Sequence, residues 1–194
     1  MKKKAFFLHA PLWAILVLIS PAGAHEHGAA RMNVAADGDQ VSISLESPLE
    51  NLLPFEHVPT TPEQRKQVAD MARRMHGAET LFQLTPAAQC RLEKVRLASE
   101  KLDPALLDPH GAPEAVQADG EKDPSGKGKK AGKEEHGDLD ADFLFMCAKA
   151  EKLAGVEVLL FAEWPGLKKI EVQAVTPKGQ RAARLTATKR MLTW

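Results

Sequence analysis

RMNVAADGDQVSISLE, residues 31–46, is the stretch that decides the fold. Apolar side chains occupy every second position on both sides of the Asp-Gly-Asp tripeptide at residues 37–39. These apolar residues are Met32, Val34, Ala36, Val41, Ile43 and Leu45. A period of two places them on one face of two strands, and Asp-Gly between such strands is typical of a tight turn. The stretch therefore predicts a β-hairpin with one apolar face.

After this hairpin, residues 61–64 (Thr-Pro-Glu-Gln) have the composition of a helix start. Thr61 is the expected N-cap, a proline follows at the first helical position, and Gln64 completes a capping box. The apolar residues that follow at helical spacing are Val68, Met71, Ala72 and Met75. Gly77 is a natural terminator. We predict an amphipathic helix over residues 62–76, with His76 at its end interacting with the helix dipole.

Further apolar segments have the lengths and spacing of strands. They are expected at residues 90–97, 142–147, 156–161, 169–175 and 180–186, and a short apolar piece at residues 81–84 leads to the first of them. The apolar positions change parity between Leu92 and Val95, which indicates a bulge. Residues 176–179 (Thr-Pro-Lys-Gly) join the last two strands as a hairpin. Strands with one clear helix predict an α+β fold, a mostly antiparallel β-sheet with one main amphipathic helix at about residues 62–76.

The amino terminus has the three parts of a secretory signal peptide. A run of lysines at residues 2–4 precedes an apolar run at 12–19, and Ala22-Gly23-Ala24 offers a cleavage site. The apolar run is too short to span a bilayer, and no later run approaches the ~20 residues needed. We expect residues 1–24 to be removed and residues 25–194 to form a single α+β domain. The mature chain is expected to be soluble and periplasmic, without a membrane span.

Charge and composition argue against nucleic-acid binding. The whole chain has 26 basic and 26 acidic residues, so removal of Lys2, Lys3 and Lys4 leaves a slightly negative mature chain. It contains no tyrosine and few other aromatic residues that could stack on bases. We expect no nucleic-acid partner and no binding to anionic membranes.

Two cysteines, Cys90 and Cys147, lie in predicted strands of a chain that is expected to reach an oxidising compartment. A structural disulfide between them is the natural interpretation. A redox-active pair is the alternative, but the chain lacks the Cys-x-x-Cys spacing that lowers a thiol pKa. Between these strands, residues 103–138 are dominated by Asp, Pro, Gly, Lys and Glu. They are expected to form a flexible insertion of the domain.

Histidines beside carboxylates are the main chemical signal. The candidate metal ligands are His25, His27, Glu56, His57, His110 and His136. Imidazole with carboxylate suits zinc, and also Cu(II) or Ni(II). Each position also has a purely structural alternative: a frayed terminus for the first two, a turn after a buried Phe55 for the next two, and a solvated loop for the last two.

The mature amino terminus adds a specific possibility. Cleavage after Ala24 would leave a free amine with a histidine, His27, at the third position. That amine, two amide nitrogens and the imidazole could close a square-planar chelate around Cu(II) or Ni(II). Zinc does not readily displace amide protons, so it would use His25 and His27 as plain imidazole ligands.

Several segments together resemble a known family. They are His25-Glu26-His27-Gly28, Leu45-Glu46-Ser47-Pro48, Phe55-Glu56-His57, Leu81-Phe82, Cys90, residues 142–147, Leu160-Phe161 with Trp164-Pro165, and residues 176–180. In order and content they resemble the ZrgA-type family of zinc-regulated periplasmic proteins. The resemblance implies a periplasmic zinc-binding accessory protein that contributes to zinc acquisition or buffering, beside a zinc ABC importer and its binding protein.

Members of that family often carry a histidine-rich tract between the two cysteine strands. The corresponding loop here retains only His110 and His136, so ligation would depend mainly on His25, His27, Glu56, His57 and His136. An enzyme is not expected, because no His-Glu-x-x-His or Gly-x-Ser-x-Gly motif is present. A metal-free periplasmic interaction or structural module is the main alternative.

Overall fold

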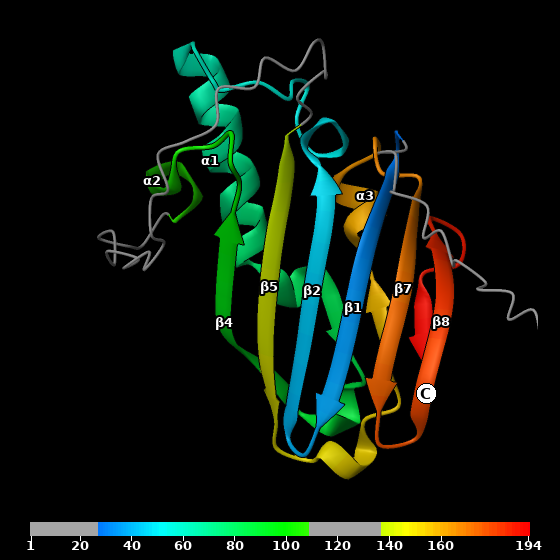
Figure 1. The fold of residues 1–194 in the computed structure, drawn as a ribbon. Helices are drawn as coiled ribbons and strands as arrows, with labels where there is room; N and C mark the ends of the chain where they lie inside the picture. Colours follow the sequence, from blue (N-terminus) through cyan, green and yellow to red (C-terminus); the bar gives the residue numbers. More distant parts are fainter. Residues whose placement is uncertain (1–26, 109–136) are drawn as a thin grey trace, which may run out of the picture.

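A computed structural model describes residues 27–108 and 137–194 (Figure 1). The predicted hairpin is confirmed as strands β1 (Ala29–Asp37) and β2 (Gln40–Pro48). They pair antiparallel around Gly38, which has a positive φ of 57°. The alternating apolar residues face the core, and Val41 and Ile43 are completely buried. The polar residues between them lie on the opposite, exposed face of the sheet.

This hairpin forms the centre of a six-stranded sheet. The other strands are β4 (Cys90–Ala98), β5 (Asp138–Cys147), β7 (Lys169–Thr176) and β8 (Gly179–Thr186). The strand order is β4-β5-β2-β1-β7-β8. Neighbours pair antiparallel except β1 and β7, which are parallel. The predicted bulge is confirmed, because the β4–β5 register shifts between Leu92 and Lys94.

Helix α1 (Pro62–His76) has the predicted bounds and the predicted capping box. The Gln64 backbone N–H donates to Thr61 Oγ1 at 3.2 Å, and Gln64 Oε1 accepts from the Thr61 backbone N–H at 3.2 Å. Its buried residues are the predicted four, Val68, Met71, Ala72 and Met75. The helix therefore begins and packs as its local sequence indicates.

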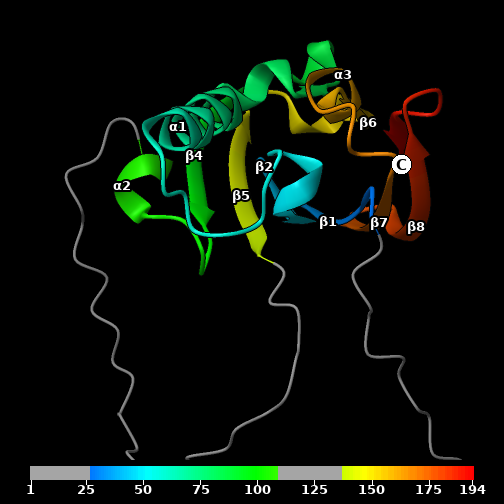
Figure 2. The same cartoon turned by 90° about the horizontal axis from the view of Figure 1, so that it is seen from above.

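A second layer covers one face of the large sheet (Figure 2). It contains α1, helix α3 (Leu160–Glu163) and a small antiparallel sheet of β3 (Phe82–Leu84), β6 (Gly155–Val158) and β9 (Met191–Thr193). Single 3-10 turns occur at Leu49–Asn51, Ala78–Thr80, Pro86–Ala88 and Ala150–Lys152. Phe82 of β3 packs on Phe143 of β5, with ring centroids 4.9 Å apart. The core lies between these two layers.

Strand β9 was not expected from the sequence, and three other elements differ from their expected bounds or structure. The strand expected at residues 156–161 ends at Val158, and α3 follows because Leu160 and Phe161 enter the core from a helical turn. Strand β5 begins at Asp138 rather than at residue 142. Helix α2 (Pro104–Leu107) lies inside the stretch expected as a flexible insertion, capped by Asp103 and held by the buried Leu107.

The predicted disulfide between Cys90 and Cys147 is present. These cysteines are opposite one another at the start of β4 and the end of β5. In the described part of the chain, no helix is long and apolar enough to cross a membrane. The predicted signal peptide, His25, and residues 109–136 of the predicted insertion, with His110 and His136, lie outside the described residues.

Candidate metal-binding site

Most of the described candidate residues lie at one end of the strands of the large sheet. This end is called the upper edge, after its position in Figure 1. At the upper edge in Figure 1, β1, β5 and β7 begin and β2 and β4 end. The strand register explains this arrangement, because Pro48 at the end of β2 pairs with Asp138 at the start of β5. Antiparallel pairing therefore brings His27, which precedes β1, to the same edge as the residues that follow β2 and precede β5.

His27 contacts a carboxylate at this edge. Its Nδ1 lies on Oε1 of Glu50, in the 3-10 turn that follows β2. The His27 side chain is 77% exposed, whereas that of Glu50 is 26% exposed. The pair therefore joins an accessible imidazole to a more sheltered carboxylate.

The backbone behind His27 is fixed by a buried asparagine. The Gly28 N–H donates to Asn51 Oδ1 at 2.9 Å, and Asn51 Nδ2 donates to the Ala29 carbonyl at 2.9 Å. The Gly28 carbonyl in turn accepts from the backbone N–H groups of Lys168 and Lys169, at 2.7 and 3.0 Å. Gly28 has a φ of 79°, where a side chain would be strained. These contacts set where the main chain presents His27.

A cavity lined mainly by carboxylates lies at the start of β5. Its volume is about 230 Å³, and it is lined by Glu46, Glu100, Lys101, Gly137, Asp138 and Asp140. Partial burial raises the pKa of Asp140, and the negative charges of Glu46, Asp138 and Asp142 raise it further. The cavity therefore has a negative potential that attracts cations.

Glu56 and His57 lie in the loop between the 3-10 turn and α1. The His57 ring stacks on the buried Phe55, with centroids 5.2 Å apart, and its Nδ1 lies 2.9 Å from the Val58 carbonyl oxygen. A carbonyl only accepts, so this nitrogen is the donor and His57 has its proton on Nδ1. The Glu56 carbonyl packs closely on Gly137, since a Cβ there would be 2.8 Å from it. The loop thus contacts the residue that follows His136 in the sequence.

The described residues do not complete a metal site on their own. Within residues 27–108 and 137–194, no three His, Cys, Asp or Glu side chains are grouped so that they could hold a metal ion. The composite site of His25, His27, Glu56, His57, His110 and His136 therefore remains a prediction. His76 lies elsewhere, with its Nε2 2.9 Å from the Leu107 carbonyl oxygen, between α1 and α2.

Several residues at this edge were not predicted from the sequence. They are Glu46, Glu50, Asn51, Glu100, Asp138 and Asp140. The alternation Asp138-Leu139-Asp140 could have indicated carboxylates on one strand face. No local pattern marks Glu50 or Asn51, because their partners are about twenty residues away in the sequence.

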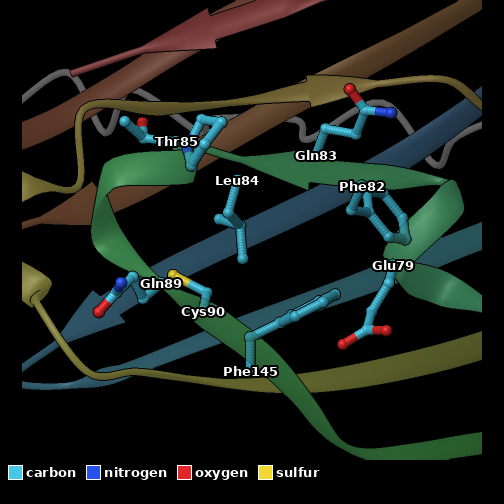
Figure 3. A pocket seen from close by; sticks show the side chains of 9 residues that line it. Glu79, Phe82, Gln83, Leu84, Thr85, Gln89, Cys90 and Phe145 are labelled. Atoms are coloured by element: carbon cyan, nitrogen blue, oxygen red, sulfur yellow. The ribbon is translucent and has the colours of Figure 1, made fainter.

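A second cavity, of about 250 Å³, lies beside the disulfide (Figure 3). Phe82, Leu84 and Phe145 point into it, and Cys90 lies at its wall. The Glu79 carboxylate at its rim accepts from the backbone N–H of Leu92 at 3.0 Å. No histidine of residues 27–108 or 137–194 lines this cavity. Its described lining contains one carboxylate, Glu79, whereas four carboxylates line the cavity at the candidate metal site.

A comparison with models of protein families identifies the family of this chain. The model of the family described as "ZrgA family zinc uptake protein" matches residues 24–194. This range covers all the described residues, so the chain belongs to the ZrgA family. A comparison with curated proteins found no match.

Proposed function

We propose that this member of the ZrgA family is a periplasmic, non-enzymatic protein that binds zinc and contributes to zinc acquisition or buffering. Membership of a zinc uptake family supports the zinc-related role. The family match begins at Ala24, beside the predicted cleavage site, which fits an exported domain that starts there. A zinc ABC importer or its binding protein is the expected recipient of the metal.

The structural observation that carries the proposal is the His27–Glu50 pair at the acidic edge of the sheet. An exposed imidazole that is oriented by a carboxylate is a common zinc-ligand arrangement. The neighbouring carboxylates would raise the local concentration of divalent cations. Further ligands would come from His25, Glu56, His57, His110 and His136.

Zinc titration of the tag-free mature protein by isothermal calorimetry tests this proposal. We expect a sub-micromolar site that is lost when His25 and His27 are both replaced by alanine. His76→Ala is the matched control, because its ring contacts the Leu107 carbonyl away from this edge. That variant should bind zinc as the wild type does.

The same titration distinguishes the alternatives. Zinc binding no tighter than that of single surface histidines would contradict the proposal and favour a metal-free interaction module. Tight binding of Cu(II) or Ni(II) with weak binding of zinc would favour the amino-terminal chelate. Extension of the mature chain by one residue would then abolish the chelate, because it displaces the terminal amine.

A further inference from the structure

The contact with Glu50 determines which nitrogen of the His27 ring carries the proton. A carboxylate accepts hydrogen bonds and donates none, so Nδ1 of His27 is the donor in this pair. In a neutral imidazole with its proton on Nδ1, the lone pair for a metal is on Nε2. The pair therefore selects one tautomer of His27.

The two ways in which His27 could bind a metal require different nitrogens. In the amino-terminal Cu(II) or Ni(II) chelate, the metal is held by the His27 backbone nitrogen and by the imidazole of the same residue. Only Nδ1 can close this ring, which contains the metal, the backbone nitrogen, Cα, Cβ, Cγ and Nδ1. A plain zinc ligand has no such constraint and can use Nε2.

Hydrogen bonds of the neighbouring Asn51 hold Glu50 beside His27, where its carboxylate can select the His27 tautomer. It is adjacent to Asn51, which is 4% exposed and hydrogen bonded on both sides of the Gly28–Ala29 peptide. The main chain that follows His27 and the turn that carries Glu50 are thus joined by the Asn51 side chain. The backbone positions of both His27 and Glu50 are consequently fixed by the Asn51 hydrogen bonds next to them.

We propose that Glu50 is a positioning residue that directs His27 to bind zinc through Nε2 and opposes the amino-terminal Cu(II) or Ni(II) chelate. The inference rests on the proposed function, since it requires zinc binding by the mature chain. A carboxylate on the second nitrogen of a zinc-bound histidine orients the ring and raises its basicity. The same carboxylate competes with Cu(II) or Ni(II) for Nδ1.

The experiment compares the mature wild type, Glu50→Ala and the control Glu63→Ala, which removes an exposed glutamate from the first turn of α1. Zinc affinity is measured by calorimetry, and Cu(II) affinity by competition with the visible absorption of the square-planar chelate as the signal. We expect Glu50→Ala to weaken zinc binding by roughly 10-fold or more and to strengthen Cu(II) binding. Circular dichroism and the melting temperature of Glu50→Ala must match those of the wild type, because an unfolded chain would lose zinc while its amino-terminal chelate, built from consecutive residues, would remain.

The tautomer itself is a second readout. Long-range ¹H–¹⁵N spectra of the metal-free wild type should show the proton of His27 on Nδ1, and Glu50→Ala should lose this preference. If the wild type binds zinc tightly but Glu50→Ala changes neither metal affinity, the role of Glu50 is overturned while the proposed function stands. If the wild type does not bind zinc, both fail.

Discussion

Asn51 links the hairpin to the proposed metal site through hydrogen bonds to two strands. Besides its bonds to Gly28 and Ala29, its Nδ2 lies 3.2 Å from Oγ of Ser47, which is completely buried. A buried amide whose partners are backbone groups leaves those groups unsatisfied when it is removed. The position of His27 therefore depends on a residue that cannot itself bind zinc in this orientation.

Asn51→Ala should lower the free energy of unfolding by about 1–3 kcal/mol, because it leaves the Gly28 N–H and the Ala29 carbonyl without this partner. Urea unfolding measures the change. Asn33→Ala, on the exposed face of β1, is the matched control and should be nearly neutral. Equal stability of the two variants would show that the Asn51 hydrogen bonds to Gly28 and Ala29 contribute nothing to the free energy of unfolding.

Asp140 should make the stability of the protein depend on pH. Burial, with Glu46, Asp138 and Asp142, raises its pKa above the ordinary value of 3.8. A carboxyl whose pKa is raised on folding stabilises the fold below the unfolded pKa, and this stabilisation is lost as the pH rises through the folded pKa. At neutral pH the charged form is therefore unfavourable in the folded protein.

Asp140→Asn should consequently raise the melting temperature at pH 7 and leave it nearly unchanged at pH 3. The gain is expected to stay below about 1 kcal/mol because solvent screens an exposed group. Added salt should reduce the difference. Glu93→Gln removes a carboxylate from β4 that is not among those acting on Asp140, and serves as the control. A stabilisation of Asp140→Asn at pH 3 equal to that at pH 7 would contradict an electrostatic cause.

Individual residues show why the candidate site was only partly predictable. His27, Glu56 and His57 were recognisable because histidine beside carboxylate is a local pattern. Among the described residues, His27 contacts Glu50, because strand pairing and the Asn51 hydrogen bonds bring the turn after β2 to the start of β1. Such contacts depend on tertiary structure, which a local sequence pattern does not contain.

At the scale of elements, those with local determinants were predicted well. The bounds of α1 follow from Thr61, Pro62 and Gly77, and the bulge in β4 from the change of apolar parity. The apolar run at residues 156–161 was misassigned because a continuous apolar run does not distinguish a buried strand from a buried helical turn. The parallel pairing of β1 with β7 and the separate small sheet arise from long-range contacts, so neither was predicted.

The disulfide joins two strands that already pair from Cys90 opposite Cys147 to Ala98 opposite Asp140. Replacement of Cys90 and Cys147 by alanine should lower the free energy of unfolding by roughly 2–5 kcal/mol. The β4–β5 register should persist, because Phe143, Phe145 and their neighbours remain buried. Denaturant unfolding and circular dichroism measure these two effects. A reducing agent should destabilise the wild type equally and leave the double variant unchanged; a lack of effect on the wild type would argue against a structural role.

The small sheet depends on Gly155. A Cβ at this position would lie 2.3 Å from the Leu192 carbonyl oxygen of β9, so the strands would have to separate. Gly155→Ala should therefore destabilise the protein by about 1–3 kcal/mol. Gly77→Ala, whose added Cβ would approach other atoms no closer than 3.4 Å, is the matched control and should cost less. Thermal unfolding of the two variants would show no difference if β6 and β9 were not packed as described.

At the scale of the whole molecule, the hydrophobic core and the disulfide lie away from the proposed metal-binding residues. The core, the small sheet and α1 lie on one face of the large sheet, and the disulfide lies at the end of β5. Of the described candidate ligands, His27 and Glu56 lie toward the opposite end of β5, where His27 contacts Glu50 and the Glu56 carbonyl packs on Gly137, the residue before Asp138. Because β5 follows directly after the segment with His110 and His136, a composite site would join that segment to the amino terminus across this edge.

Such a composite site predicts energetic coupling between residues that are distant in the sequence. If His27 and His136 bind the same zinc ion, the loss of binding free energy in the double alanine variant should differ from the sum of the single losses. Calorimetric titration of the mature wild type, the two single variants and the double variant measures this coupling. His27→Ala combined with His76→Ala is the control cycle and should be additive, because His76 lies between α1 and α2. Additive losses in the His27–His136 cycle would show two separate sites and would contradict a shared zinc ion at this edge.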